Sequence, residues 1–338
     1  MKPTNLSKYL GKYLLEYLPN TMGLSHNTIA SRRDSYMLLF LYLKTVKGYK
    51  PETVEIPLLS KELIVEFLCW LETERDSSAA TRNIRLSAIK ALFGYIQTQT
   101  PDYMHQCLQI ISIPLKKVKE KGLEYLTLNG VKAILDAVDI HHDKSLRDIT
   151  LLSLMYDSAA RVQEIADLSI DDFRFEKPCT LRLTGKGCKN RFIPLMEPTV
   201  VLIKQYIESF HNLKMLEKGT PFFCNRSGKK LTRAGISYIL TKYVNKARVK
   251  NPSLLPVTVT PHGLRHSKSM HMLQAGVPLI YIRDYLGHVE ISTTEIYAKC
   301  DISQKREAIE ASYPDFRNRE FAIWHSNDDM LDWLKSLC

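Results

Sequence analysis

One lysine-rich segment constrains the fold of this chain more than any other feature. Residues 114–122, with the sequence PLKKVKEKG, have no apolar period and end in glycine. Such a segment has no face to pack against a core, so it predicts a linker between two folded parts. The 338 residues suit two domains of ordinary size. We therefore predict a helical N-terminal domain over 1–113, a basic linker over 114–125, a second domain over 126–300 and a tail over 301–338.

The N-terminal part has the apolar spacing of packed helices. Apolar residues recur every three or four positions after Ser25 or Thr28, after Ser60, and after the polar break at 76–78. Serine and threonine are favoured N-cap residues because their hydroxyl accepts a hydrogen bond from a free backbone N–H. These positions therefore predict three helix starts.

The second part mixes helices with one β-hairpin. We expect one helix to begin at Thr127 and another to run from about Ser145 to Leu168. Over 180–195, apolar and polar residues alternate on either side of Gly185-Lys186-Gly187, which predicts a β-hairpin with a lysine at its tip. The predicted fold class is mainly α with a small β-hairpin or sheet.

The balance of charge indicates a polyanionic partner. Lysine and arginine number 47 against 36 aspartate and glutamate, which gives a net charge of +11. No apolar run approaches the ~18 residues needed to span a bilayer, so we expect no membrane partner. Seven scattered cysteines favour neither a disulfide framework nor a zinc ribbon. They predict a reducing, cytoplasmic location.

Six basic residues are candidates for contact with a phosphate backbone: Arg82, Arg85, Lys90, Lys116, Lys117 and Lys119. The first three lie mostly off the apolar face of their predicted helix, and the other three lie in the linker. A helix with such a face can lie against DNA, because phosphate contacts come largely from arginine and lysine. The alternative for the three helical residues is an ordinary solvated basic surface.

The segment 260–300 carries the most specific pattern of the chain. Thr260 followed by Pro261 is typical of a helix start. His262, Arg265 and His266 then fall at positions i, i+3 and i+4, on one face of the first turn. Free backbone N–H groups and the helix dipole favour an anion at such a place, and an arginine there can bind two phosphate oxygens.

Further along, Leu286-Gly287-His288 is followed after nine residues by Tyr297. With His262, Arg265 and His266, these residues resemble the C-terminal signature of the tyrosine recombinase (phage integrase) family, Xer-like or encoded by a mobile element. Arg161 resembles the first catalytic arginine of that family, and Lys186 its catalytic lysine. The chain departs from the family in Ser158-Ala159, where Thr-Gly is common, and in Asn129-Gly130, where acidic residues are usual.

The resemblance implies a role for each matched residue. Tyr297 would attack a DNA phosphate and form a 3′-phosphotyrosine, while Arg161 and Arg265 would bind the non-bridging oxygens. Lys186 would protonate the leaving 5′-oxygen, and His262 would manage the tyrosine proton. His288 would form a hydrogen bond to the phosphate, and Glu164 and His266 would support the site.

The resemblance also implies an architecture and a set of partners. A helical core-binding domain and an α+β catalytic domain would form a C-shaped clamp around double-stranded DNA, with no metal and no cofactor. Strand exchange would pass through a Holliday junction in a tetramer, with accessory recombinases or DNA-bending proteins as further candidate partners. We expect a cytoplasmic, nucleoid-associated protein that integrates, excises or transposes a mobile element.

The tail 301–338 differs in charge from the rest of the chain, with eight acidic and five basic residues. It also carries apolar residues, among them Trp324, Leu331 and Trp333. An acidic, apolar tail is expected to contact protein and not DNA, which predicts contacts between protomers. The alternative is that it folds back on its own domain.

Other functions remain open at this point. A type IB topoisomerase would use the same chemistry on DNA, and a catalytically silent DNA-binding regulator could share the scaffold. A zinc site at His262 and His266 is disfavoured, because the glutamate of the H-E-x-x-H pattern is absent.

Overall fold

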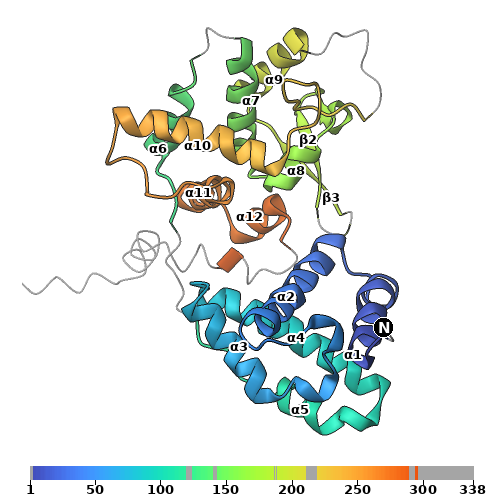
Figure 1. Cartoon of the computed structure of the whole chain (residues 1–338). Helices are drawn as coiled ribbons and strands as arrows, with labels where there is room; N and C mark the ends of the chain where they lie inside the picture. The colour runs from blue at the N-terminus through green and yellow to red at the C-terminus, as the bar shows by residue number, and fades with distance from the viewer. Residues whose placement is uncertain are drawn as a thin grey trace, which may run out of the picture. The chain divides into compact units, whose positions relative to one another are not determined.

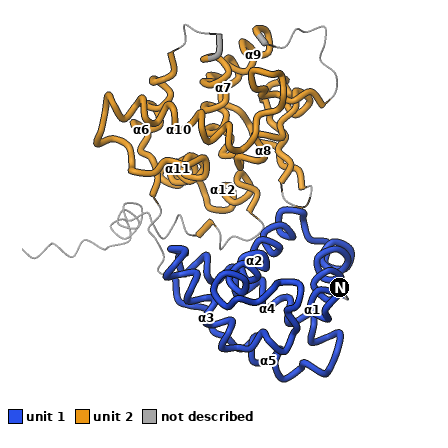
Figure 2. Tube along the Cα trace, viewed as in Figure 1, with its two compact units in different colours: residues 1–121 blue, residues 122–338 orange. Residues whose placement is uncertain are grey.

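The computed structural model describes residues 3–118, 124–139, 143–185, 187, 189–210, 219–288, 294 and 295. The chain divides into two compact units, Met1–Lys121 and Gly122–Cys338 (Figure 2). The division falls inside the lysine-rich segment, and the exact limits of the four predicted segments stay a prediction. Each unit contains its own hydrophobic core.

The described residues of the first unit form helices joined by loops, with no strand (Figure 1). Its elements are α1 (Asn5–Lys12), the π-helix η1 (Tyr13–Thr21), α2 (His26–Thr45), η2 (Pro51–Thr53), η3 (Ile56–Leu58), α3 (Lys61–Thr73), α4 (Ala79–Gln99), η4 (Pro101–Tyr103) and α5 (Met104–Ile111). Ser25, Ser60 and Ser78 are the N-caps of α2, α3 and α4, and each hydroxyl accepts a backbone N–H three residues on. The helix starts predicted from Ser25 and Ser60 are therefore confirmed.

The core of the first unit is rich in aromatic side chains. Tyr13, on the unpredicted π-helix, lies against Tyr36 of α2 and Tyr95 of α4. The hydroxyl of Tyr36 donates to the carbonyl of Ala88 at 2.8 Å. The Tyr13 hydroxyl accepts a hydrogen bond from Arg32. Burial raises the pKa of all three tyrosines, so the cluster stays neutral and acts as packing.

The second unit combines helices with one small sheet (Figure 1). Its elements are α6 (Leu128–Asp136), α7 (Asp143–Ser158), α8 (Val162–Asp167), η5 (Ile170–Asp172), β1 (Phe173–Arg174), β2 (Thr180–Thr184), β3 (Asn190–Pro194), α9 (Glu197–Phe210), α10 (Arg233–Lys250), α11 (Pro261–Gln274) and α12 (Leu279–Leu286).

The predicted hairpin is formed by β2 and β3. The two strands pair antiparallel, with Leu181 opposite Ile193, and both of these side chains are buried. The short strand β1 adds to the free edge of β2, which the sequence did not predict. The fold class, mainly α with a small sheet, is confirmed.

The helix predicted from Ser145 to Leu168 is wrong in one respect, because it is broken. Helix α7 ends at Ser158, and α8 begins at Val162. Between them Ala159 has a φ of 46°, a left-handed conformation that stops an α-helix. The hydroxyl of Ser158 donates to Leu154 in the last turn and accepts the N–H of Ala160, so it satisfies backbone groups at the break.

No helix in the described part of the chain is long and apolar enough to cross a membrane.

Candidate active site

The site is built around the C-terminal end of α12. Three consecutive carbonyl groups there each accept a hydrogen bond from an arginine of a different element. The carbonyl of Tyr285 accepts from Arg191 at 3.1 Å, that of Leu286 from Arg265 at 2.6 Å, and that of Gly287 from Arg161 at 3.4 Å. The last carbonyls of a helix have no partner within it and carry the negative end of its dipole, so cations are favoured there. The helix end thus gathers three guanidinium groups.

The first of these, Arg161, lies at the start of α8 because the preceding helix breaks. It is the N-cap residue of α8, and its backbone N–H donates to the Glu164 carboxylate at 2.8 Å. Its side chain donates to the other oxygen of the same carboxylate at 2.9 Å. The Arg161 side chain is still 40% exposed, so a phosphate can reach it.

The second, Arg265, is a buried charge. It lies on α11, where Thr260 is the N-cap and Pro261 the first residue, as predicted. Only 1% of Arg265 is exposed, and it donates to the carbonyl of Ala159 at 2.7 Å as well as to Leu286. The break between α7 and α8 therefore also supplies an acceptor for Arg265.

Sequence reasoning missed the third arginine, Arg191 on β3. Two of its nitrogens donate to the two oxygens of Glu164, at 2.9 and 2.7 Å. Glu164 itself is buried. One signal could have identified Arg191: it lies two residues before the buried Ile193, so it shares the inward face of its strand.

Burial, reinforced by the charges of nearby arginines, lowers the pKa of the three neighbouring histidines. Burial, Arg265 and Arg161 lower the pKa of His288 to about 4. Burial, His262 and Arg265 lower the pKa of His266 to about 4. Partial desolvation, Arg265 and Arg161 lower the pKa of His262. The His262 side chain is exposed, and its ring lies beside the ring of His266. All three imidazoles are therefore neutral at pH 7 and can accept a proton or share one with an anion.

Two predicted catalytic residues, Lys186 and Tyr297, lie outside the described residues, but their neighbours lie at this site. A Cβ added at Gly185 would lie 3.5 Å from the carboxylate of Glu164. Thr294, three residues before Tyr297, is buried, and its hydroxyl lies 3.0 Å from Nδ1 of His288.

The predicted DNA-contacting residues of the first unit differ in placement. Arg82 is buried, with Nε 3.8 Å from Glu72, and this favours a structural role. Arg85 donates to the carbonyl of Ser31 and to the hydroxyl of Ser35, at 3.3 and 3.1 Å. Lys90 is half-buried, and burial lowers its pKa.

In the predicted linker, Lys116 is exposed but forms an ion pair with Glu72 at 2.7 Å. Lys117 is exposed. Lys119 lies outside the described residues.

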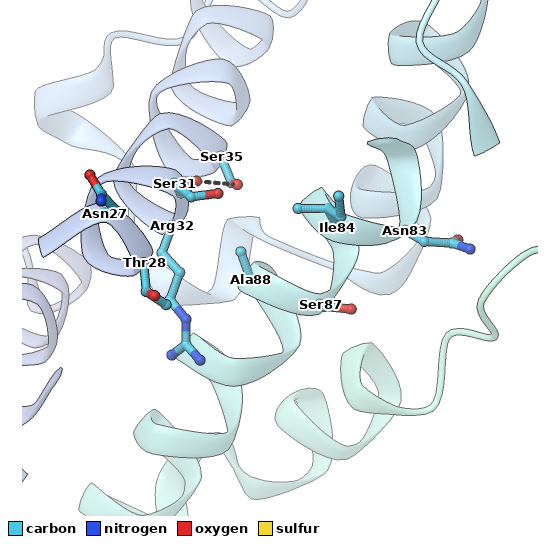
Figure 3. Close-up of a pocket in the computed structure, with 9 residues that line it drawn as sticks. All are labelled: Asn27, Thr28, Ser31, Arg32, Ser35, Asn83, Ile84, Ser87 and Ala88. Carbon is cyan, nitrogen blue, oxygen red and sulfur yellow. Dashed lines mark hydrogen bonds between the residues drawn. The ribbon is translucent and has the colours of Figure 1, made fainter. Parts of the chain in front are cut away.

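A pocket of about 510 Å³ lies between α2 and α4 (Figure 3). Three of its nine lining residues are Arg32, Ile84 and Ala88, and the other six have small side chains with a polar group: Asn27, Thr28, Ser31, Ser35, Asn83 and Ser87. Arg85 is not one of the lining residues, but it donates to two of them, Ser31 and Ser35. Side chains of this kind hydrogen-bond readily to phosphates and base edges.

Comparison with known families decides the classification. Residues 124–303 match the model of the Phage integrase family, and residues 12–99 match that of the phage integrase N-terminal SAM-like domain. The chain belongs to the phage integrase family. The resemblance drawn from the motifs is confirmed.

The similarity of this integrase-family chain to individual relatives extends over most of its length. It is 30% identical over 338 residues to a putative integrase/recombinase, y4rC, of Sinorhizobium fredii, with 99% of both chains covered. It is 31% identical over 304 residues to the tyrosine recombinase XerD of Staphylococcus epidermidis, with 89% of this chain and 97% of XerD covered.

Solved structures confirm the fold. The XerH site-specific recombinase bound to a palindromic difH substrate superposes with a TM-score of 0.68 at 21% identity, covering 92% of this chain and 99% of XerH. The Tn1549 transposon integrase in complex with a circular intermediate DNA superposes with a TM-score of 0.69 at 18% identity. It covers 92% of this chain and 100% of the integrase.

Proposed function

We propose that this integrase-family chain is a site-specific DNA recombinase that uses Tyr297 as its nucleophile. One observation carries the proposal: Arg161 and Arg265 bind consecutive carbonyls at the end of α12, immediately before His288. Two guanidinium charges therefore act on the neutral imidazole of His288, which stands nine positions before Tyr297 in the sequence. Such a group of donors matches the charge that develops on the non-bridging oxygens of a phosphate under attack.

The reaction follows from these groups. The phenol oxygen of Tyr297 attacks phosphorus and the bond to the 5′-oxygen breaks, so that a 3′-phosphotyrosine and a 5′-hydroxyl form. His262 accepts the phenol proton, for which its lowered pKa keeps it unprotonated at pH 7. Lys186 donates a proton to the 5′-oxygen. The phosphodiester energy is retained in the tyrosyl ester, so a second DNA 5′-hydroxyl can reverse the step on a new strand.

Arg161 and Arg265 are proposed to act on the phosphate in different ways. Arg161 is exposed enough to bind an oxygen directly, while Arg265 is buried and bound to two carbonyls. Arg265 therefore contributes mainly through its charge, which is felt by His262, His266 and His288.

The DNA partner is proposed to contact the first unit at the pocket between α2 and α4. Arg32 and Arg85 provide charge there, and the hydroxyl and amide side chains provide hydrogen bonds. Lys90, Lys117 and Lys119 are proposed as further phosphate contacts. The burial of Arg82 removes it from this surface.

The biological role is proposed from the relatives. Their names include an integrase, Xer recombinases and a transposon integrase, so we propose integration, excision or transposition of a mobile element through a Holliday junction. A tetramer is proposed to assemble through the tail 301–338. Deleting 313–338 should then leave binding to one half-site unchanged but abolish cooperative binding to two. Cooperative binding by the shortened chain would refute this role of the tail.

A covalent-complex assay on nicked DNA tests the proposal. The wild-type chain should form a protease-sensitive adduct with a nicked site, whereas Tyr297→Phe should bind the same DNA and form none. Arg161→Ala should slow adduct formation by ~10²-fold, as the loss of a donor to a transition-state charge does elsewhere. DNA binding with no adduct in the wild type would instead identify a silent regulator. Relaxation of supercoiled DNA without exchange between two sites would identify a topoisomerase.

The role of Lys186 has a separate test. A substrate whose leaving 5′-oxygen is replaced by sulfur needs no proton on the leaving group. Lys186→Ala should therefore cleave that substrate at the wild-type rate and be slow on ordinary DNA. Equal defects on both substrates would make Lys186 a phosphate contact and not an acid.

A further inference from the structure

Resting on the function proposed above, we infer that Arg191 is a positioning residue for the reaction. It fixes the β2–β3 hairpin, Arg161 and the end of α12 to one another. Arg191 lies on β3, the strand that leaves the hairpin tip, and it bonds to two other segments. Two of its nitrogens donate to Glu164 of α8, at 2.9 and 2.7 Å, and its Nε donates to the carbonyl of Tyr285 at 3.1 Å.

Arg191 acts on Arg161 through a shared carboxylate. Oε1 of Glu164 accepts from both arginines at 2.9 Å, and Oε2 accepts the backbone N–H of Arg161 at 2.8 Å. The carboxylate is 4% exposed, so its charge depends on these partners and not on water. Burial alone would raise the pKa of Glu164, but Arg191 and then Arg161 outweigh it and lower the pKa.

Without Arg191, the buried carboxylate keeps Arg161 as its only described cationic partner. The Arg161 guanidinium is then expected to turn inward to neutralise Glu164, away from the exposed position from which it reaches a phosphate. The Arg191 side chain is only 12% exposed, so it does not itself offer a surface for DNA. The loss of Arg191 should therefore slow cleavage with little effect on binding.

The packing around Arg191 indicates that its geometry matters as well as its charge. A Cβ added at Gly287 would lie 2.9 Å from Cδ of Arg191 and 3.0 Å from one of its terminal nitrogens. The guanidinium is thus enclosed between Glu164 and the end of α12. A lysine has the charge but not the planar fork that bonds two carboxylate oxygens and a carbonyl together.

The test compares Arg191→Met and Arg191→Lys with a matched control, Arg182→Met. Arg182 lies on the adjacent strand β2 and also pairs with a carboxylate, Asp172 at 2.8 Å, outside the site. Two quantities are measured for each variant: the dissociation constant for a half-site, and the single-turnover rate of adduct formation on nicked DNA. Thermal unfolding shows whether each variant is folded.

We expect both Arg191 variants to bind the half-site within about two-fold of wild type. Adduct formation should slow by roughly 10- to 100-fold, the loss that a misplacement of about 1 Å produces. Arg182→Met should change neither quantity. Adding Glu164→Gln to Arg191→Lys should slow adduct formation little further, because both changes break the same interaction between Arg191 and Glu164.

Three results would overturn the inference. Adduct formation by Arg191→Lys at the wild-type rate would do so even if Arg191→Met does not fold. If the double variant slowed adduct formation by the product of the two single-variant factors, Arg191 would not act through Glu164. A wild-type chain that binds DNA without forming an adduct would overturn the proposed function itself, and the role of Arg191 with it.

Discussion

Each unit of the chain holds a glutamate between two basic side chains, and the two arrangements differ in burial. In the first unit, Glu72 lies 2.7 Å from Lys116 and 3.8 Å from Arg82, and its side chain is 22% exposed. In the second, Glu164 is 4% exposed and bonds to Arg161 and Arg191 at 2.7 to 2.9 Å.

The difference indicates what each cluster does. An exposed pair such as Glu72 with Lys116 is screened by water and contributes little to stability. A buried carboxylate with two arginines gains little net free energy either, but it is costly to break, because one partner is left charged and unpaired. The cluster around Glu164 therefore holds the side chains of Arg161 and Arg191 in fixed directions, whereas the cluster around Glu72 lies closer to solvent and is expected to matter less.

The largest expected effect comes from removing each glutamate in turn. Glu164→Ala leaves two arginines without their shared partner and should lower the free energy of unfolding by about 3–5 kcal/mol. Glu72→Ala should cost about 2 kcal/mol or less, and Lys116→Ala less than about 1 kcal/mol. Urea denaturation of the three variants measures this. Equal losses for Glu164→Ala and Lys116→Ala would contradict the distinction between the clusters.

An intermediate effect is expected from two glycines of the second unit. Gly287 and Gly276 both have positive φ, at 64° and 80°, but only Gly287 lies against another side chain, that of Arg191. Gly276→Ala should cost about 1 kcal/mol from the backbone alone. Gly287→Ala should cost roughly 1–3 kcal/mol more through overpacking, and should slow adduct formation. Thermal denaturation and the nicked-DNA assay compare the pair, and equal behaviour would show that Arg191 tolerates displacement.

The smallest expected effect is on the acid sensitivity of the second unit. His266 and His288 have pKa values of about 4 in the folded chain, below the usual value near 6.5 in an unfolded one. The unfolded state therefore binds protons first as the pH falls. Their contribution is complete above about pH 6.5 and is lost progressively toward pH 4.

His266→Asn should accordingly flatten the pH dependence of stability between pH 6.5 and 4.5. Replacing the exposed His105 of the first unit by asparagine is the matched control for the loss of an imidazole. Denaturant titrations at several pH values give the slopes. A slope unaffected by His266→Asn would show that this histidine is protonated alike in both states.

Much of the fold could be predicted because the signals are local. Ser25, Ser60 and Thr260 cap helices through hydroxyls that act within one turn, and the β2–β3 hairpin follows from alternation around glycines. The break at Ala159 could not be predicted, because the residue adopts a conformation that alanine disfavours. Its carbonyl bonds to Arg265, which lies over 100 positions away in the sequence.

The candidate site also has one part that the sequence could predict and one part that it could not. The motif residues Arg161, Arg265 and His288 could be identified from spacing and from the resemblance to a family. The anchor that the two arginines share, the carbonyls at the end of α12, could not be predicted, because backbone groups carry no mark in the sequence. Arg82 shows the limit of patterns: its helix position indicated a basic surface, but its side chain is buried beside Glu72.

The most direct test of the account is to locate the DNA-bound residue by mass spectrometry. Trypsin releases residues 284–299 as one peptide that holds two tyrosines, Tyr285 and Tyr297. Tyr285 is an internal control, since its hydroxyl bonds to the carbonyl of Asp157 and burial raises its pKa. After reaction with nicked DNA and nuclease digestion, fragmentation of this peptide should place the nucleotide remnant on Tyr297. A remnant on Tyr285 or on another peptide would contradict the assignment of the nucleophile.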